Sequence, residues 1–481
     1  MPNVSGYSNY DGLGLAELVR KGEVTPAELL DDALAGIDTV NGQLNAVVAR
    51  IDDLARAEIA AGLPDGPFKG VPFFVKELGV QAKGMPSRCG SKLTEHLVAA
   101  EDSELMKRFR AAGLVAAGMT ATPEFGYNPT TESVFYGPTH NPWDLEHTPG
   151  GSSGGSAAMV AAGVVPLAHA NDGGGSIRIP AACCGLVGLK PTRQRVPTGP
   201  AFGDWLNGYA CELIVSRSVR DTAAMLDAVQ GPDVGPPNII TPPARPYLDE
   251  MRAGAGKLRV GWTATPMNGA PVHPHVVDGL HDTVKLVESL GHEMVETRFD
   301  IDWPHYFEQL VTIWTAYVAW AIDGVANAVR RTPSIENLER VTWEIYQHGK
   351  RLSALHMHDA LANFNTVCRQ SGALFEQVDV MLTPTVAQPP LRLGTLDQNA
   401  IGVDAREWSR QVFDWIPFTP LCNTTGQPAI SLPLSWSPDG LPIGMQFAGR
   451  LNDEATLIRL AAQLEQAQPW ADRKPPVWFA T

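Results

Sequence analysis

A serine that directly follows three glycines is the residue in this sequence best suited to do chemistry. The run is Gly173-Gly174-Gly175, and the serine is Ser176. Consecutive glycines leave their backbone N–H groups unshielded by side chains, so these groups can hold a negatively charged oxygen beside the serine hydroxyl. A nucleophile next to such donors suits acyl transfer, provided that a base takes the proton of the hydroxyl.

Two further segments offer the base and a partner for it. A second glycine-serine run contains Ser152 and Ser153, and the apolar run Val71–Val75 leads into a lysine, Lys76. A lysine acts as a base at neutral pH only when its pKa falls well below the ordinary value of about 10.4, and burial among apolar side chains lowers it. These residues predict a serine hydrolase whose base is a lysine rather than a histidine.

Other motifs fit these segments less well. Gly150–Gly154 has the G-x-S-x-G form of a nucleophile elbow, but that elbow needs an apolar strand before it, and the polar Glu146–Pro149 stands there instead. His147 and His169 are the histidines nearest the motifs, and we expect both to be structural. We expect Arg178 to form a structural ion pair. No glycine-rich run ends in the Gly-Lys-Ser/Thr of a phosphate loop.

The order and spacing of the motifs resemble the amidase signature family, serine hydrolases with a Ser–cis-Ser–Lys triad. Matching segments run from Gly70 to Val196 and from Asp379 to Gly449. Within this family the sequence is similar to 6-aminohexanoate-cyclic-dimer hydrolases and related amidases and urethanases. The resemblance implies a hydrolase that cleaves a C–N bond of a small or medium, largely uncharged amide, cyclic amide or carbamate, with urethanase or esterase side activity.

The resemblance also implies a role for each motif residue. Ser176 is the nucleophile that carries the acyl group, Lys76 is the base, and Ser152, which follows a cis peptide bond, relays the proton between them. Ser153 supports this triad. The oxyanion hole consists of the backbone N–H groups of Gly173, Gly174, Gly175 and Ser176. No metal and no organic cofactor are implied.

Aromatic residues near the motifs are candidates for the substrate pocket. Phe125, Gly126 and Tyr127 stand where the family has wall residues of the acyl site. Trp314 lies in an apolar helical stretch that would form a lid or a second wall. The family commonly has a threonine at the position of Gly173, and we expect the glycine either to loosen the oxyanion loop or to admit a bulkier acyl group.

Helices and strands alternate along the chain, and these elements must position the motifs. The patterns predict strands at 71–75, 114–118, 164–168 and 258–262, a turn-rich segment at 379–385, and helices at 12–60, 102–113, 157–162, 219–229, 275–290, 305–331, 341–375 and 453–466. This alternation predicts an α/β structure. The resemblance implies the amidase signature fold, a mixed central β-sheet covered on both faces by α-helices. We expect one domain over 1–481, with its core at about 60–230 and 379–450 and a variable, substrate-facing region at about 232–378.

Composition and charge indicate which kinds of molecule the protein binds and where it is located. The net charge is −15 and no block of lysine and arginine occurs, which argues against nucleic acid or anionic lipid. The longest apolar run, 313–322, is too short for a membrane span, and the first residues show no secretory signal. The six cysteines form no metal-binding pattern and are expected to be reduced thiols. We therefore expect a cytoplasmic enzyme that acts on a small molecule, and by resemblance a homodimer.

Two alternative functions remain open. The first is the glutaminase subunit of a tRNA-dependent amidotransferase, which belongs to the same family and has the same triad. The tryptophans of region 232–378 argue against it. The second is a catalytically inactive binding protein of the same fold, and the presence of Lys76, Ser152 and Ser176 argues against that.

Overall fold

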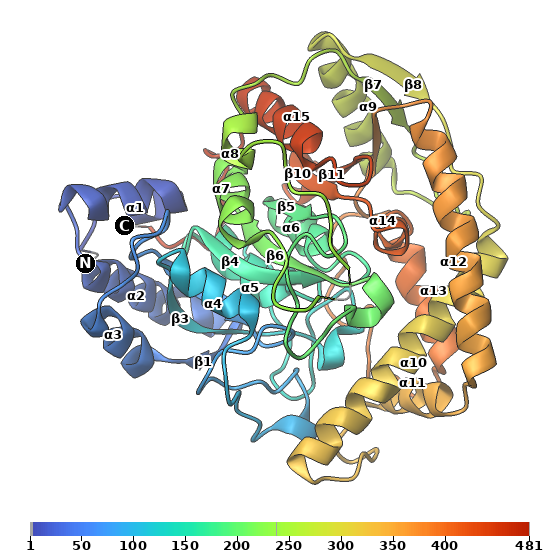
Figure 1. Ribbon diagram of the computed structural model, residues 1–481, viewed down its shortest axis with the longest axis horizontal. Helices are drawn as coiled ribbons and strands as arrows, with labels where there is room; N and C mark the ends of the chain where they lie inside the picture. The colour runs from blue at the N-terminus through green and yellow to red at the C-terminus, as the bar shows by residue number, and fades with distance from the viewer. Residues whose placement is uncertain (1–2, 237, 481) are drawn as a thin grey trace.

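A single mixed β-sheet runs through the centre of the molecule (Figure 1). The computed structural model describes residues 3–236 and 238–480. Within them the strands, in order across the sheet, are β1 (Val47–Arg50), β3 (Val115–Thr120), β2 (Pro72–Lys76), β4 (Leu167–Asp172), β6 (Cys211–Ser216), β5 (Val187–Lys190), β10 (Ala429–Trp436), β11 (Pro442–Ala448), β9 (Val380–Pro384), β7 (Arg259–Trp262) and β8 (Glu293–Glu296). Strand β2 is parallel to β3 and β4, β7 is parallel to β8 and β9, and the other pairs are antiparallel.

Helices surround this sheet. They are α1 (Gly12–Lys21), α2 (Pro26–Leu44), α3 (Asp52–Ala61), α4 (Glu104–Ala111), α5 (Gly154–Ala161), α6 (Arg178–Cys184), α7 (Val219–Val229), α8 (Tyr247–Glu250), α9 (Pro274–Ser289), α10 (Trp303–Val329), α11 (Arg340–Lys350), α12 (Ala354–Phe375), α13 (Ala405–Trp415), α14 (Pro420–Thr425) and α15 (Glu454–Ala467). Short 3₁₀ turns are η1 (Tyr7–Asn9), η2 (Lys92–Thr94), η3 (Glu124–Gly126) and η4 (Trp205–Gly208).

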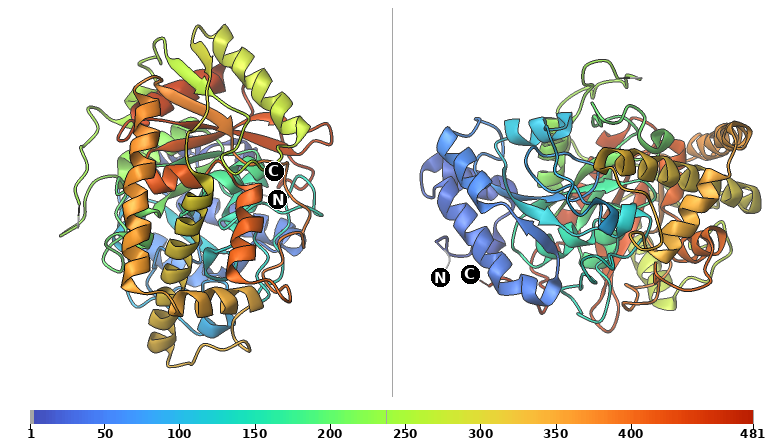
Figure 2. Two further views of the ribbon diagram at one scale, coloured as in Figure 1. Left: turned by 90° about the vertical axis from the view of Figure 1, so that its right-hand side faces the viewer. Right: turned by 90° about the horizontal axis from the view of Figure 1, so that it is seen from below.

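Both faces of the sheet are covered. Every residue of β2, β3 and β4 is buried, and side chains alternate between the two faces along a strand, so neither face is open to solvent there. Helices α5 and α6 pack together on the central strands, and α7 packs with α8 and α15 (Figure 2). The predicted mixed sheet between helical layers is thereby confirmed.

Two of the predicted helical stretches are divided in the structure, and the turn-rich segment 379–385 contains strand β9. The stretch 12–60, predicted to be helical, contains β1 between α2 and α3. This strand has four residues and pairs with β3, far away in the sequence, so no local pattern marks it. The stretch 341–375 is two helices, because Ser353 caps the start of α12 and interrupts the pattern.

A second group of helices, α10 to α13, lies at the right-hand side of Figure 1. Helix α10 packs against α11, α12 and α13, and their apolar side chains form a core apart from the larger one around the sheet. No helix in the described part of the chain is long and apolar enough to cross a membrane; the apolar run 313–322 belongs to α10.

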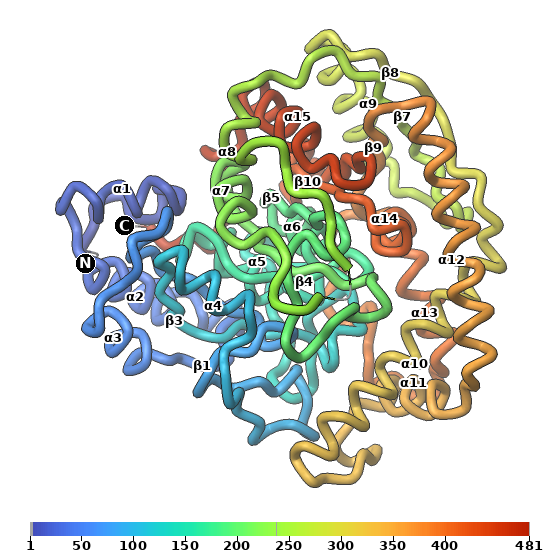
Figure 3. Tube along the Cα trace, viewed as in Figure 1, coloured from blue at the N-terminus to red at the C-terminus, as the bar shows by residue number. Residues whose placement is uncertain are grey.

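Region 232–378 is joined closely to the rest of the chain. It contributes α9 to α12 and also β7 and β8, which extend the same sheet beyond β9. The C-terminal segment returns to the N-terminal helices, where Phe479 packs against Tyr7, and the two chain ends lie near each other (Figure 3). The organisation as one domain stays a prediction, and the continuous sheet is what favours it.

Candidate active site

Lys76 lies at the carboxyl end of β2, and its side chain is completely buried. Its Nζ lies 2.7 Å from Ser152 Oγ, 3.0 Å from Ser153 Oγ and 2.6 Å from Asn171 Oδ1. The structure therefore brings together three residues that the sequence singled out, and it adds Asn171, which the sequence analysis missed.

The topology explains this meeting. Strands β2 and β4 are parallel neighbours, so Lys76 at the end of one and Asn171 at the end of the other share an edge of the sheet. Ser152 and Ser153 come from the loop that enters α5, and the Gly151–Ser152 peptide bond is cis. Asn171 could have been identified from the sequence by comparing the polar residues at the ends of neighbouring parallel strands.

Burial changes the acid–base properties of Lys76. It lowers the pKa of the amine from 10.5 to about 7, although the nearby charges of Glu212, Asp172 and Cys89 act in the opposite direction. His169 lies between Lys76 and Glu212. Its Nδ1 accepts the backbone N–H of Lys76 at 3.2 Å, and its Nε2 lies 2.6 Å from a carboxylate oxygen of Glu212. An amine in this environment is available in its neutral form near neutral pH.

Neither histidine near the motifs reaches the cavity that holds Ser176. His169 is fully buried between Lys76 and Glu212. His147 pairs with Arg392 in a short bridge, and its Nδ1 lies 3.1 Å from Asp144. Both are structural, as predicted.

Ser176 follows a turn that Asp172 holds in place. The two carboxylate oxygens of Asp172 accept the N–H groups of Gly175 at 2.7 Å and Ile177 at 3.3 Å. Gly175 has a φ of 137°, and a Cβ there would lie 2.5 Å from Ile179 and from Thr419, so only glycine fits this position. The turn leaves Ser176 8% exposed, at the wall of a cavity.

The glycine turn presents fewer free donors than the sequence suggested. In the described residues, the backbone N–H groups of Gly173, Gly174 and Ser176 have no hydrogen-bond partner, whereas the N–H of Gly175 donates to Asp172. Gly175 is therefore not a free oxyanion donor, because the carboxylate that shapes the turn occupies it. Three of the four expected donors remain.

Arg178 forms the expected structural ion pair. Its Nε and Nη2 each lie 2.9 Å from Asp172, and both side chains are completely buried. The same guanidinium donates to Thr419 O, Asn423 Oδ1 and Gln446 Oε1. Arg178, together with Asn423 and Lys190, holds the pKa of Asp172 at about 2 despite its burial, so the carboxylate that holds the turn stays charged.

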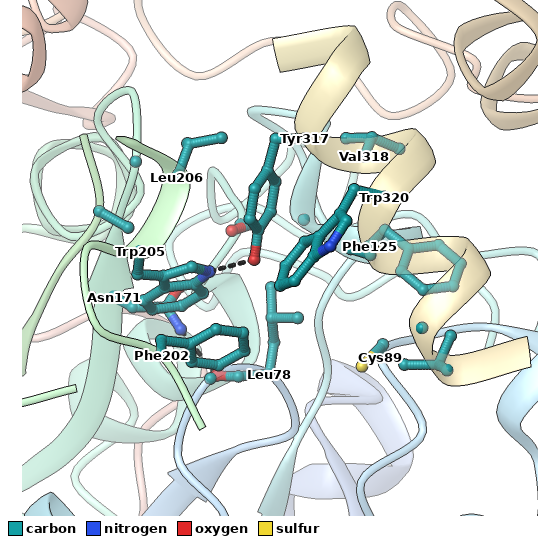
Figure 4. A pocket seen from close by; sticks show the side chains of 18 of the residues that line it. Leu78, Cys89, Phe125, Asn171, Phe202, Trp205, Leu206, Tyr317, Val318 and Trp320 are labelled. Carbon is teal, nitrogen blue, oxygen red and sulfur yellow. Dashed lines mark hydrogen bonds between the residues drawn. The ribbon is translucent and has the colours of Figure 1, made fainter. Parts of the chain in front are cut away.

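A cavity of about 260 Å³ opens at Ser176, and we call it the inner cavity. Ser152, Asn171, Gly173 and Ser176 line one part of it. The remainder is mostly apolar and aromatic, and Figure 4 shows much of this wall: Leu78, Cys89, Phe125, Phe202, Trp205, Leu206, Tyr317, Val318 and Trp320. Among the described residues, none with a charged side chain lines the inner cavity.

The predicted wall residues are only partly correct. Phe125, Gly126 and Trp314 line the inner cavity. Tyr127 does not: it is buried behind Trp314, stacked on the indole at 4.8 Å, and its hydroxyl bonds to Ser409 Oγ at 2.8 Å. Tyr127 is a core residue that supports Trp314.

Gly173 does not create the extra room expected from its size. A Cβ at this position would lie 3.0 Å from the Trp314 indole and 3.1 Å from Leu206. The indole therefore occupies the space beside the glycine. The aromatic wall residues Phe202 and Trp205 were not foreseen, because the loop 197–208 has no periodic pattern and its contact with α10 is tertiary.

The mixed sheet between helices and the cavity at Ser176 fit an α/β enzyme that acts on a small molecule. The model of the family described as Amidase matches residues 28–458, most of the chain, and the chain belongs to this family. It is thus an amidase, a hydrolase that acts on carbon–nitrogen bonds other than peptide bonds.

Similar proteins agree with this assignment. The 6-aminohexanoate-cyclic-dimer hydrolase of Paenarthrobacter ureafaciens is 36% identical over 478 residues, covering 97% of this chain and 96% of that protein. A solved structure of a 6-aminohexanoate cyclic dimer hydrolase has a TM-score of 0.92 and 34% identity, over 98% of this chain and 99% of that one. A solved subunit of the glutamyl-tRNA(Gln) amidotransferase from Thermotoga maritima has a TM-score of 0.76 and 25% identity, over 98% of each chain.

Proposed function

We propose that this amidase hydrolyses small or medium, uncharged amides, cyclic amides or carbamates through an acyl-enzyme on Ser176. The observation that carries the proposal is the absence of charged side chains among the described residues that line the inner cavity, beside Ser152 and Ser176. A site of this kind favours neutral substrates, because a charged group would lose its hydration there without gaining a partner. The similarity to the 6-aminohexanoate-cyclic-dimer hydrolase supports a cyclic amide within this class.

The contacts of Lys76 support its role as the base. A neutral amine has two N–H donors and one lone pair. Asn171 Oδ1 can only accept, and Ser153 Oγ, which donates its own proton to Asn171 O at 3.3 Å, accepts as well. Both N–H groups are then engaged, and the lone pair is left for the hydroxyl proton of Ser152 at 2.7 Å.

The proposed reaction uses this arrangement. Lys76 takes the proton of Ser152 while Ser152 takes that of Ser176, whose oxygen attacks the carbonyl carbon. The N–H groups of Gly173, Gly174 and Ser176 stabilise the oxyanion. The C–N bond then breaks, the proton returns through Ser152 to the leaving nitrogen, and water hydrolyses the acyl-enzyme by the same relay.

The two alternatives are less well supported. Glutamine carries an ammonium group and a carboxylate, and no charged partner for either lines the inner cavity within the described residues. The amidotransferase protein is also the less similar structure, with a TM-score of 0.76 against 0.92. An inactive binding protein would not need a buried lysine within 2.7 Å of a serine hydroxyl.

A substrate panel with three variants tests the proposal. The panel contains aliphatic amides, anilides, cyclic amides, carbamates, esters and glutamine. We expect turnover of neutral amides by the wild type, and Ser176→Ala and Lys76→Ala to lose at least about 90% of it, since each removes an essential part of the relay. Ser152→Ala should be damaging but less so, because a water can bridge Lys76 and Ser176.

Controls separate this mechanism from others. His147→Ala should keep its activity, and a fluorophosphonate probe should label the wild type but not Ser176→Ala. Preferred hydrolysis of glutamine would contradict the neutral-substrate proposal, and full activity in Lys76→Ala would contradict the relay. The homodimer and the cytoplasmic location also remain proposals; light scattering after size-exclusion chromatography tests the first, and cell fractionation tests the second.

A further inference from the structure

A second cavity adjoins the inner one. This outer cavity has a volume of about 430 Å³ and lies between the loop 201–207 and helix α10. The two cavities share five lining residues, Phe202, Trp205, Leu206, Tyr317 and Trp320. The side chains from the loop and from α10 face one another across the junction (Figure 4). A substrate longer than the inner cavity would therefore reach the outer cavity along these side chains.

Aromatic rings from two segments form the junction. Trp205 stacks on Phe202 at 5.1 Å, and Tyr317 packs against Trp320 at 5.6 Å. The indole N–H of Trp205 donates to the hydroxyl of Tyr317, which joins the loop to the helix. Trp320 is 60% exposed, so an aromatic face stands at the solvent side of the junction.

The outer cavity differs from the inner one in charge. Asp204 is the one residue with a charged side chain among the described residues that line the outer cavity. Its Oδ1 accepts the side-chain N–H of Gln194 at 2.9 Å, and within the described residues its Oδ2 has no partner. Aromatic faces together with a carboxylate attract an organic cation and disfavour an anion.

We propose that the outer cavity binds a positively charged amine end of an elongated substrate whose neutral amide lies at Ser176. This inference rests on the proposed function, and it adds a chemical requirement at the far end of the substrate. The inner cavity selects the uncharged scissile group, and the aromatic junction with Asp204 selects the charge of the distal group.

Isosteric substrates test this directly. Matched 4-nitroanilides end in a trimethylammonium, a tert-butyl or a carboxylate group, on a chain long enough to span both cavities. A parallel series of amides carries the same groups on the amine side, so the result does not depend on binding direction. Because trimethylammonium and tert-butyl have the same shape, the ratio of their kcat/KM values measures charge recognition. We expect this ratio to be about threefold to thirtyfold in at least one series, with the carboxylate poorest.

Variants assign the effect to the outer cavity. Asp204→Asn should bring the ratio near one while kcat/KM for the tert-butyl substrate changes little. Trp320→Ala should also bring the ratio near one, and because Trp320 lines the inner cavity as well, it should lower kcat/KM for both substrates. Asp233→Asn is the matched control, since it changes net charge equally but lines neither cavity, and Trp320→Phe should retain the preference. A wild-type ratio near one, or a ratio unchanged in both variants, overturns the proposal. Failure of the proposed function gives a different result, because no anilide is then hydrolysed. In that case, calorimetry with Ser176→Ala measures the dissociation constants of the same substrate pairs, and their ratio still reports charge recognition.

Discussion

At the scale of single residues, the environment of Lys76 determines what the site can do. The amine is useful as a base only when it is neutral and when its lone pair points at Ser152. Burial provides the first condition, because it lowers the pKa to about 7. The acceptors Asn171 Oδ1 and Ser153 Oγ provide the second, because they engage both N–H groups.

Removal of the Asn171 acceptor should therefore misdirect the lone pair. We expect Asn171→Leu, which keeps a similar size without an acceptor, to lower kcat about tenfold to a hundredfold, a part of the usual contribution of general-base catalysis. The melting temperature and the kcat should be measured together. The conservative Asn171→Gln should recover part of the activity. An Asn171→Leu variant with normal kcat would contradict the positioning role.

The pH dependence should report the same amine. In the proposed mechanism the base is neutral Lys76, so kcat/KM should rise with pH through about 7 and then stay high. The charge of Glu212 favours the protonated amine and raises its pKa, so Glu212→Gln should move this rise to lower pH. Profiles of kcat/KM against pH for both proteins test the direction. A shift to higher pH, or none, would show that Glu212 does not act on Lys76.

At the scale of elements, helix α10 and the glycine turn form one unit. Trp314 of α10 packs on the turn at Gly173 and is itself backed by Tyr127. The wall of the inner cavity thus depends on a helix that is more than a hundred residues away in the sequence. Substitutions in α10 should therefore change the substrate preference without changing the proposed proton relay.

A double-mutant cycle tests the coupling of the helix and the turn. Gly173→Ala should lower activity, because its methyl group would press on Trp314 and displace the oxyanion donors. Trp314→Ala should change the order of preference across the substrate panel toward bulkier acyl groups. The double variant should recover part of the activity that Gly173→Ala loses. Strictly additive losses would mean that the indole and the turn act independently.

At the scale of the whole molecule, the candidate catalytic residues are easier to predict from the sequence than the residues that line the cavity. Lys76, Ser152 and Ser176 are recognisable because short glycine-rich and apolar motifs carry them, and the strand–helix alternation predicts the layered sheet. The engagement of Gly175 by Asp172, the position of Tyr127 behind Trp314 and the aromatic junction follow from tertiary contacts. Strand β1 was missed for the same reason, since its partner β3 lies far along the chain.

Stability of the whole molecule should respond to pH differently from activity. Burial raises the pKa of Glu77 from 4.5 to about 7, although Tyr136 and Arg88 act in the opposite direction; among the described residues its Oε1 has no hydrogen-bond partner and lies 3.9 Å from Arg88 Nε. The folded protein therefore binds more protons than the unfolded chain between these values, so this group's contribution to stability is full below about 4.5 and is lost as the pH rises to about 7. Lys76 acts in the opposite sense above about 7, because its folded pKa is depressed.

We therefore expect the melting temperature to fall between about pH 5 and pH 7. Glu77→Gln keeps a neutral side chain at every pH and should flatten part of this fall, while the exposed Glu288→Gln should leave it unchanged. Thermal unfolding of the three proteins at several pH values measures the slopes. If the melting temperature falls equally steeply with pH in all three proteins, Glu77 does not have a raised pKa in the folded protein. The fall would then come from other groups.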